Sequence, residues 1–254
     1  MSTSIQYLSV RPARTARELQ DLFQLRYEGY LDSHCASLVE EAPHGFTFEA
    51  YDWNALHMGL FQEGHYGSRP LGYMRLVQPG PAPHLHLLNE LAGQYGYAPD
   101  IKARPLPLLE SCPQRAPIQA HLHQLQQDGL PYVEASRFVF RSDARSSGYT
   151  RFMLDATLGS LLFRHHYQAI LLACHPRHAA AYYRYGFRQI VDGRQNDYNG
   201  LAASILSLQE KDIRKTVWDR LERIRPSMEQ YGGVAFHPES KQYSAPFSML
   251  ELAA

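Results

Sequence analysis

The residues best placed for chemistry lie in one polar turn, inside the segment VEASRFVFRSDARSSGYTRFML, between a strand-like and a helix-like stretch. Arg145, Gly148 and Thr150 form an R-x-x-G-x-T pattern there. Backbone N–H groups at the start of a helix favour an anion, and glycine lets that anion approach closely. The pattern therefore predicts a phosphate or pyrophosphate site, supported by the cations Arg141, Arg145 and Arg151. The alternative is a solvated loop in which a serine caps the helix.

The strand before this turn carries charge on both faces. In a regular strand Glu134 shares a face with Ser136 and two phenylalanines, whereas Arg137 points to the other face. In a central strand this is costly unless the charges are paired or line a cleft. A β-bulge near Ser136 would bring Glu134 and Arg137 toward one side, splay the sheet and leave backbone groups for a ligand. A salt bridge at the end of the strand is the alternative.

Hydrophobic periodicity predicts the elements that position these residues. Thr15, followed three residues later by Glu18, is typical of a helix start. Predicted strands cover residues 5–11, 55–62, 70–80, 133–140, 168–176, 187–191 and 202–209, and predicted helices cover 15–31, 116–129, the stretch after the polar turn, 177–187 and 210–225. This order predicts one α/β sheet with helices on both faces.

We expect a single domain over residues 1–254. Residues 79–131, rich in proline and histidine, have too little apolar periodicity for a core of their own and predict an insertion. The helix and tail at about 209–254 complete the chain. Gly186 predicts a left-handed helix end, and Pro226 predicts the end of the last helix. The tail from Gly232 has no clear pattern.

Composition excludes few functions. A chain of 254 residues with 44% hydrophobic residues can bury a substantial core. Lys plus Arg (25) equals Asp plus Glu (25), so whole-chain charge gives no support for a nucleic-acid partner, and we expect none. Three scattered cysteines and no signal-like or membrane-length apolar run favour a reduced, cytoplasmic protein.

Thirteen histidines raise the question of a metal, but none has an H-x-x-x-H spacing with a partnering glutamate on a helix. We therefore expect no metal site. A catalytic cysteine also lacks a signature, because Cys174 ends an apolar strand and such a cysteine is more often buried than reactive.

Several motifs together carry a family resemblance. The polar turn, the apolar strand after it, AAAYYRYGF and the next strand resemble the GCN5-related N-acetyltransferase fold over residues 133–208. LFQLRYEGY, YDWNALH, GYMRLV and EASRFVF, in this order, extend the resemblance toward the N-terminus. They resemble the motifs of acyl-homoserine-lactone autoinducer synthases, of N-acyl amino acid synthases and of the similar acyltransferases found with exosortase systems.

This resemblance implies a GNAT-like mixed sheet with a splayed middle, and an enzyme that moves a medium- or long-chain fatty acyl group from acyl carrier protein to the amine of an amino acid. It implies no tightly bound cofactor; the acyl-phosphopantetheine of acyl carrier protein, or acyl-CoA, is the co-substrate. The implied donor-binding residues are Phe138, Val139, Arg141, Arg145, Gly148 and Thr150. The implied acceptor-binding residues are Arg26, Tyr30, Asp52, His57 and Arg75.

The implied reaction centre holds Glu134, Arg137 and Tyr182. Because a thioester is already activated, the enzyme mainly positions a neutral amine and stabilises the oxyanion. An α-amine with a pKa of about 8 is roughly one-tenth neutral at pH 7, so Glu134 can accept the proton directly or through water. Tyr182 and Tyr185 lie three residues apart on one helix; Tyr182 can donate a proton to the leaving thiolate, and core packing is the alternative.

Arg26, Asp52 and Arg75 fit the acceptor, because a carboxylate favours a bidentate arginine and an ammonium favours a carboxylate. An internal Arg–Asp network that fixes the first helix to the hairpin is the alternative. Relatives usually carry an acidic residue and a glycine soon after LRYEGY. Here Glu40, Glu41 and Gly45 come later, which predicts a rebuilt amine pocket.

Other functions stay open. These are an acyl-homoserine-lactone synthase that uses S-adenosylmethionine, an acetyl-CoA-dependent acetyltransferase, and a non-catalytic module that binds an acyl ligand. The basic residues of the last helix, with those of the polar turn, can dock an acidic carrier protein. Peripheral contact with lipid is a further expectation.

Overall fold

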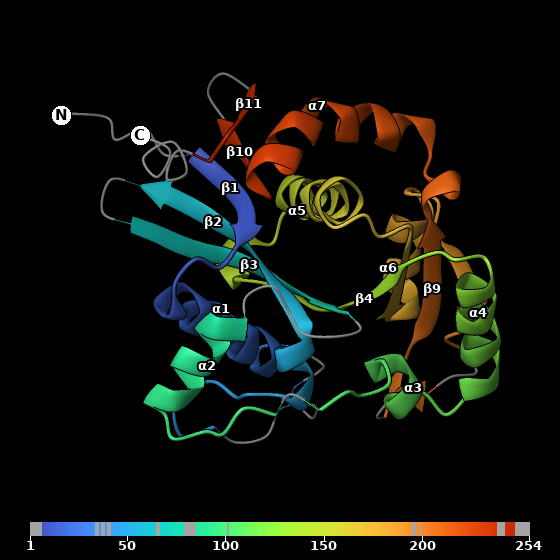
Figure 1. Cartoon of the computed structure of the whole chain (residues 1–254), viewed down its shortest axis with the longest axis horizontal. Coiled ribbons are helices and arrows are strands. Elements are labelled where there is room, and N and C mark those ends of the chain that lie inside the picture. The colour runs from blue at the N-terminus through green and yellow to red at the C-terminus, as the bar shows by residue number, and fades with distance from the viewer. Residues whose placement is uncertain are drawn as a thin grey trace.

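A single mixed β-sheet organises the molecule (Figure 1). The computed structural model describes residues 7–33, 36, 39, 42–64, 67–78, 85–100, 102–194, 197–198, 200–237 and 242–246. The strand order in the described chain is β11-β10-β1-β2-β3-β4-β5-β9-β6. The strands are β1 (Tyr7–Pro12), β2 (Ala55–Gly64), β3 (Gly67–Val77), β4 (Tyr132–Phe140), β5 (Ala169–Cys174), β6 (Arg188–Val191), β9 (Ser204–Gln209), β10 (Val234–His237) and β11 (Gln242–Ser244). A separate short pair joins β7 (Asp197–Tyr198) to β8 (Leu201–Ala202).

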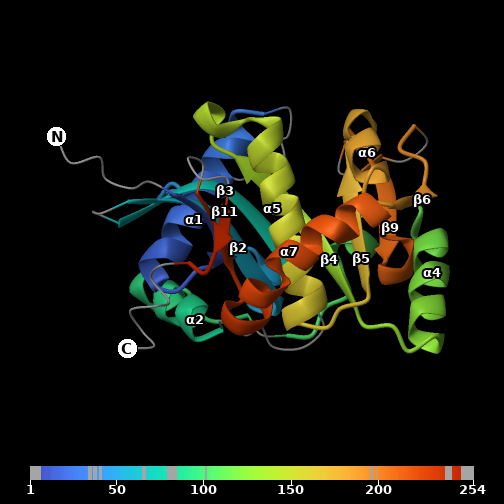
Figure 2. The same ribbon diagram turned by 90° about the horizontal axis from the view of Figure 1, so that it is seen from above.

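Helices cover both faces of this sheet, which confirms the predicted fold class. One face packs against α5 and α7 in a core that includes Met153, Leu221 and Ile224, and α6 packs beside them on β5 and β9. The other face packs against α1 and α2 near β2 and β3, and against α3 and α4 near β5 and β9. Figure 2 shows α5 and α7 crossing in front of the sheet. The helices are α1 (Ala16–Leu31), α2 (Leu85–Gln94), α3 (Pro107–Ser111), α4 (Arg115–Gln127), α5 (Ser147–Gly159), α6 (Pro176–Tyr183) and α7 (Lys215–Tyr231), with a π-helical turn at Ser160–Arg164 after α5.

The sheet opens between β4 and β5. These parallel strands pair only from Tyr132 to Ala135 on β4, because a register shift against β3 then redirects β4. Arg137 lies in this irregular stretch with φ of +56°, a left-handed conformation that costs free energy for a non-glycine residue. Beyond Ala135, β5 stays with β9 and β4 stays with β3. The predicted bulge is therefore present, and it divides the sheet into two diverging halves.

Local signals explain the boundaries of α1 and α6. The Thr15 hydroxyl accepts the Glu18 N–H at 3.1 Å, which is the predicted N-cap of α1. The turn after α6 contains Gly186 with φ of +111°, and a Cβ there would lie 2.0 Å from the carbonyl oxygen of Asp212. Glycine is therefore required both by the backbone conformation and by the close approach of the chain before α7.

The predicted end of the last helix is wrong. α7 (Lys215–Tyr231) continues through Pro226. Gly232 follows it as the C-cap, with a φ of +64° and its N–H donated to the carbonyl oxygen of Met228. A proline inside a helix loses one hydrogen bond, but Ile224 and Met228 are buried on either side of it and hold the helix on the core.

Regions with weak sequence patterns are also ordered. The tail forms β10 and β11, which extend the sheet beyond β1. Residues 79–131 contribute α2, α3 and α4, all packed on the common sheet. No helix in the described part of the chain is long and apolar enough to cross a membrane.

Candidate acyl-transfer site

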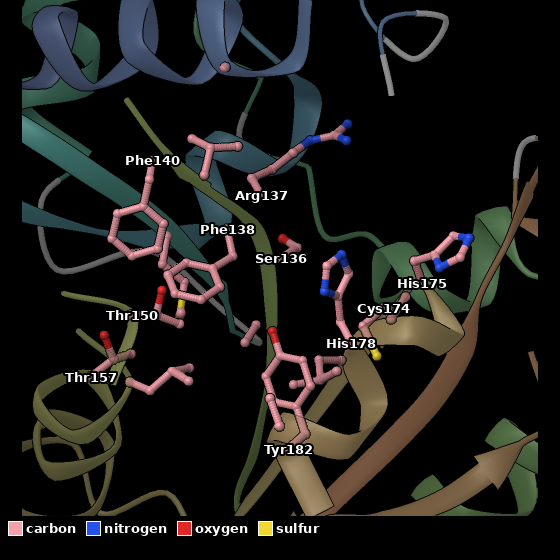
Figure 3. Close-up of a pocket in the computed structure, with 18 of the residues that line it drawn as sticks. Ser136, Arg137, Phe138, Phe140, Thr150, Thr157, Cys174, His175, His178 and Tyr182 are labelled. Atoms are coloured by element: carbon pink, nitrogen blue, oxygen red, sulfur yellow. The ribbon is translucent and has the colours of Figure 1, made fainter. Parts of the chain in front are cut away.

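A cavity of about 670 Å³ lies where β4 and β5 diverge (Figure 3). Its walls come from the end of α1, the irregular part of β4, the length of α5, the end of β5 and the start of α6. Cavities of this size bind small molecules and cofactors. The divergence of two parallel strands thus creates a concave site.

The inner wall of the cavity is apolar. It is formed by apolar residues of β3, α5, the π-helical turn and β5: Met74, Leu154, Leu158, Leu161, Ile170 and Leu172. Phe138 and Phe140 add two rings at 5.0 Å from each other. This wall fits an alkyl chain, because burial of each CH₂ contributes about 0.8 kcal/mol.

The start of α5 forms one edge of the cavity. Arg145 and Thr150 line it, and the Ser146 hydroxyl caps the helix by accepting the Tyr149 N–H at 3.3 Å. Gly148 lies inside the first helical turn, where an added Cβ would meet only the Ser146 hydroxyl, at 3.9 Å. Arg141 bonds to Asp143 and does not line the cavity. The predicted anion site is therefore a helix N-terminus with one arginine at the cavity edge.

The network of charges on the α1 side of β4 is buried and internally paired. Arg26 makes two hydrogen bonds to Asp52, at 2.8 and 3.1 Å, and also donates to the carbonyl oxygen of Thr47. Arg75 Nη1 lies 2.9 Å from Asp52 Oδ1 and 2.8 Å from Glu49 Oε2. Burial alone would raise the pKa of Asp52, but the two arginines offset it and hold that pKa below its usual value. This arrangement matches the internal network that the sequence allowed.

Glu49 connects this network to the cavity. Its Oε2 accepts from Arg137 Nε at 3.0 Å and Nη2 at 2.8 Å, and from Arg75. Arg137 lines the cavity and lies 5.2 Å from the ring centroid of Tyr30, which also lines it. Sequence reasoning missed Glu49. The signal was the E-x-x-D capping box with Asp52, in which the Glu49 N–H bonds to Asp52 at 2.9 Å.

His57 is buried beside that network and makes hydrogen bonds with both of its ring nitrogens. Its Nε2 lies 3.0 Å from the carbonyl oxygen of Asp52, and its Nδ1 lies 2.9 Å from the Tyr73 hydroxyl. Since a carbonyl only accepts, Nε2 carries the proton and Tyr73 donates to Nδ1. Burial lowers the pKa of His57 to about 4, so the ring is neutral at pH 7.

Glu134 is buried on the face that contacts α3. Its Oε2 accepts the Leu108 N–H at 3.0 Å, and its side chain is not part of the cavity wall. Burial raises its pKa to about 8, against the opposing effects of the Leu108 N–H, Arg75 and Arg137. Ser136 shares its strand face, lines the cavity, and accepts from Arg75 Nε at 3.1 Å. Ser136 is thus the polar group that links Glu134's side of the strand to the cavity.

Tyr182 lies on the α6 wall. Figure 3 shows its hydroxyl pointing into the pocket, with His178 from the same helix beside it. Its ring packs edge-on against Phe187 at 5.5 Å, and burial raises its pKa. Tyr185, by contrast, donates to buried Asp155 at 2.8 Å, and Arg220 holds the same carboxylate at 2.6 Å. Asp155 therefore joins α5 to the turn after α6 through Tyr185 and to α7 through Arg220.

The cavity collects some of the sequence-predicted residues and not others. It is lined by Tyr30, Arg137, Phe138, Val139, Arg145, Thr150 and Tyr182. The predicted residues outside its wall are Arg26, Asp52, His57, Arg75, Glu134, Arg141 and Gly148. Glu40 and Glu41 lie outside the described residues. Sequence reasoning missed Ser136, His178 and Thr157. In the described chain, no three His, Cys, Asp or Glu side chains gather closely enough to hold a metal ion.

Comparisons with known proteins agree with this fold. Residues 110–209 match the family model of the N-acyl amino acid synthase FeeM. The structure of FeeM, an N-acyl amino acid synthase from uncultured soil microbes, superposes with a TM-score of 0.52 and 15% identity, over 83% of this chain and 93% of that one. BjaI, a CoA-dependent acyl-homoserine lactone synthase with SAM and isopentyl-CoA, gives a TM-score of 0.50 and 14% identity, over 86% and 88%. No curated protein sequence matches this chain.

The fold is therefore that of the GNAT-like acyltransferases, with the sheet open between β4 and β5. The match to the FeeM family model identifies an acyltransferase, and the matched region runs from α3 through β9, across the cavity.

Proposed function

We propose that this acyltransferase moves a medium- or long-chain fatty acyl group from the phosphopantetheine thioester of acyl carrier protein to the amine of an amino acid. The observation that carries the proposal is the cavity itself. It joins the start of α5, where we place the donor's phosphate, to an apolar inner wall that fits an alkyl chain. The FeeM family match supports the amino acid acceptor.

The donor's phosphate sits at the first turn of α5 in this proposal. The N–H groups of a helix's first turn have no intrahelical acceptor, and the positive helix end favours negative charge. Arg145 and Thr150 stand at the cavity edge there, and Arg141, Gly148, Phe138 and Val139 complete the predicted donor-binding set. The pantetheine arm then follows β4 into the opening, where strand backbone beyond Ala135 no longer pairs with β5.

The acceptor approaches from the side of Tyr30 and Arg137. Both residues line the cavity, and Glu49 holds the Arg137 guanidinium with two hydrogen bonds. Arg137 can bind the carboxylate of an amino acid. In this proposal the predicted acceptor residues outside the cavity wall do not touch the acceptor. They hold Glu49 and the irregular part of β4 in place: Arg26, Asp52, His57 and Arg75. The buried pairing of Asp52 favours this supporting role over direct contact.

Glu134 accepts the amine proton through water in this proposal. A pKa of about 8 matches that of an α-amine, which suits proton transfer near neutral pH. Because the carboxyl is not in the cavity wall, the proton passes beside Ser136, which shares its strand face. Tyr182 lies within the same cavity and donates a proton to the leaving thiolate. Glu134→Gln should lower the transfer rate about 10²- to 10⁴-fold and leave donor affinity unchanged.

The test is a transfer assay with purified protein, read by mass spectrometry. Thioesters of acyl carrier protein and of CoA, over a range of chain lengths, are each offered with amino acids and, separately, with S-adenosylmethionine. The expected product is an N-acyl amino acid, formed faster from the carrier-protein thioester. A lactone product would assign autoinducer synthesis instead. Intact thioesters throughout, with ligand affinity unchanged in Glu134→Gln, would indicate a binding module and contradict the proposal.

A further inference from the structure

A histidine in the cavity wall has no role in the proposed reaction. His178 lies on α6 among the residues that line the cavity. It precedes Tyr182 by four residues, so the two side chains share one face of the helix. Figure 3 shows both side chains pointing from α6 into the pocket. His178 therefore faces the space that the thioester occupies in the proposed reaction.

A hydrogen bond between His178 and Arg177 indicates which ring nitrogen carries the proton. Arg177 Nε lies 3.2 Å from His178 Nε2. A guanidinium only donates, so Nε2 is the acceptor and the proton of the neutral ring is on Nδ1. The nitrogen that could act as a base is thus already engaged by a cation. His178 is suited to donate a hydrogen bond from Nδ1 rather than to accept a proton.

Two neighbours of His178 in the cavity wall are suited to other roles. His175 Nδ1 accepts the Arg177 N–H at 3.3 Å and caps α6. Burial raises the pKa of the Cys174 thiol to about 12, so that thiol is not a nucleophile at neutral pH. The His178 N–H and the Tyr182 hydroxyl are the neutral donors that α6 directs into the cavity.

Two atoms become negative when an amine displaces a thiol from a thioester. The amine nitrogen forms a bond to the carbonyl carbon, and the π electrons of the C=O bond move onto the oxygen. The C–S bond then breaks, the C=O bond forms again, and the sulfur takes a proton. Tyr182 serves the sulfur in the proposed reaction. The carbonyl oxygen requires a donor that is in place before the reaction begins.

We propose that His178 is a catalytic residue that donates a hydrogen bond from Nδ1 to the thioester carbonyl oxygen and stabilises the oxyanion formed there. The ring keeps its proton throughout, and Glu134 and Tyr182 keep their proposed proton transfers. This inference rests on the proposed function, because it assigns the reacting carbonyl to this part of the cavity. It adds an oxyanion donor to the reaction centre.

Three variants separate hydrogen-bond donation from the other roles of a histidine. His178→Ala removes the donor, whereas His178→Asn places an amide N–H close to the position of Nδ1 and cannot take up a proton. His123→Asn is the control, because His123 lies on α4 outside the cavity wall.

The first measurement is the single-turnover rate of acyl transfer at saturating donor. His178→Ala should be about 10- to 100-fold slower than wild type. This loss is smaller than that of an enclosed oxyanion donor, because the His178 side chain is exposed. His178→Asn should recover most of the rate, and His123→Asn should match wild type.

The second measurement detects the hydrogen bond without any transfer. An acyl phosphopantetheine thioester with an isotope-labelled carbonyl is bound in the absence of an acceptor, and its infrared stretch is recorded. A carbonyl that accepts a hydrogen bond absorbs at lower frequency. The bound carbonyl should therefore absorb at lower frequency in wild type and His178→Asn than in His178→Ala. Thermal unfolding of His178→Ala, expected at the wild-type midpoint, checks that the variant folds.

Two results would overturn the inference. One is the same carbonyl frequency in wild type and His178→Ala. The other is a His178→Asn variant as slow as His178→Ala, which would make His178 a proton acceptor. Failure of the proposed function is distinguishable. A carbonyl shift that depends on His178, in a protein that transfers no acyl group, supports the contact and removes the function. Efficient transfer that is unaffected by His178→Ala does the reverse.

Discussion

The two sides of β4 treat polar groups in opposite ways. On the α1 side, the carboxylates of Glu49 and Asp52 are paired with arginines at hydrogen-bond distance. On the α5 side, a cavity is lined mainly by alkyl and aromatic side chains, and the hydroxyl of Thr157 has no hydrogen-bond partner among the residues that the structure describes. On the α1 side the charged groups already form ion pairs and hydrogen bonds with one another. On the α5 side the cavity leaves space for contacts with a ligand. This difference supports the proposal that the first side is structural and that the second side binds the ligand.

The largest expected effect tests the paired side. Asp52→Ala leaves the guanidinium groups of Arg26 and Arg75 buried with one carboxylate fewer, and breaking a buried pair costs about 3–5 kcal/mol. Urea unfolding should show a loss of this size. Asp143→Ala, which removes the exposed partner of Arg69, is the control and should leave the unfolding midpoint unchanged. A small loss for Asp52→Ala would contradict the structural assignment.

The second prediction concerns the pH dependence of stability at Glu134. Because its folded pKa of about 8 exceeds the unfolded value, the folded state binds the proton more tightly. The stabilisation is present in full below the unfolded pKa and is lost as pH rises toward about 8, at up to about 1.4 kcal/mol per pH unit. Glu134→Gln should therefore gain stability relative to wild type across that window. Parallel pH profiles of the two proteins in urea unfolding would refute the burial of this carboxyl.

The third prediction concerns a substitution that partly fills the cavity on the α5 side. Leu154→Trp places an indole against the space proposed for the alkyl chain and should reduce transfer of long acyl groups about 10- to 100-fold, with a smaller effect on short ones. Leu109→Trp is the control, because Leu109 is also half-buried but lies on α3 and does not line the cavity. Kinetics over a series of chain lengths make the measurement. Equal losses at all chain lengths would place the alkyl chain elsewhere.

The smallest expected effect concerns the first turn of α5. Gly148→Val adds a branched side chain where the structure leaves open space, so stability should hold, whereas the KM for the donor should rise several-fold to about tenfold. Gly93→Val, at an equally open position in α2, should leave the KM unchanged. Loss of stability in parallel with donor use would reduce the polar turn to an ordinary loop.

Sequence could predict the frame of this site because its signals are local. Thr15 and Glu18 mark the start of α1, and charges on both faces of β4 indicate the bulge that the structure contains. The tail strands were not predictable in this way, since β10 is stabilised by pairing with β1, more than two hundred residues away in the chain. Pro226 shows the same limit, because tertiary packing of Ile224 and Met228 outweighs a local helix breaker.

The sequence alone could not predict which of the candidate residues line the cavity and which support it from behind. Arg26 and Arg137 are both arginines in family-like motifs, yet one is buried against Asp52 and the other reaches the cavity. Only the three-dimensional pairing decides which is which. Thr157 had no signal at all, because a threonine in an apolar helix is unremarkable until its surroundings are known.

Photo-crosslinking tests the central claim most directly, namely that the acyl chain lies on the α5 side of β4. An acyl thioester with a diazirine at the end of its chain is bound, irradiated and mapped by peptide mass spectrometry. We predict labels on α5 and β5, at residues 154–161 and 170–172, and their loss when an unlabelled acyl thioester competes. Labels confined to Ala50–Asn54 and α3, on the side of the paired charges, would contradict the assignment.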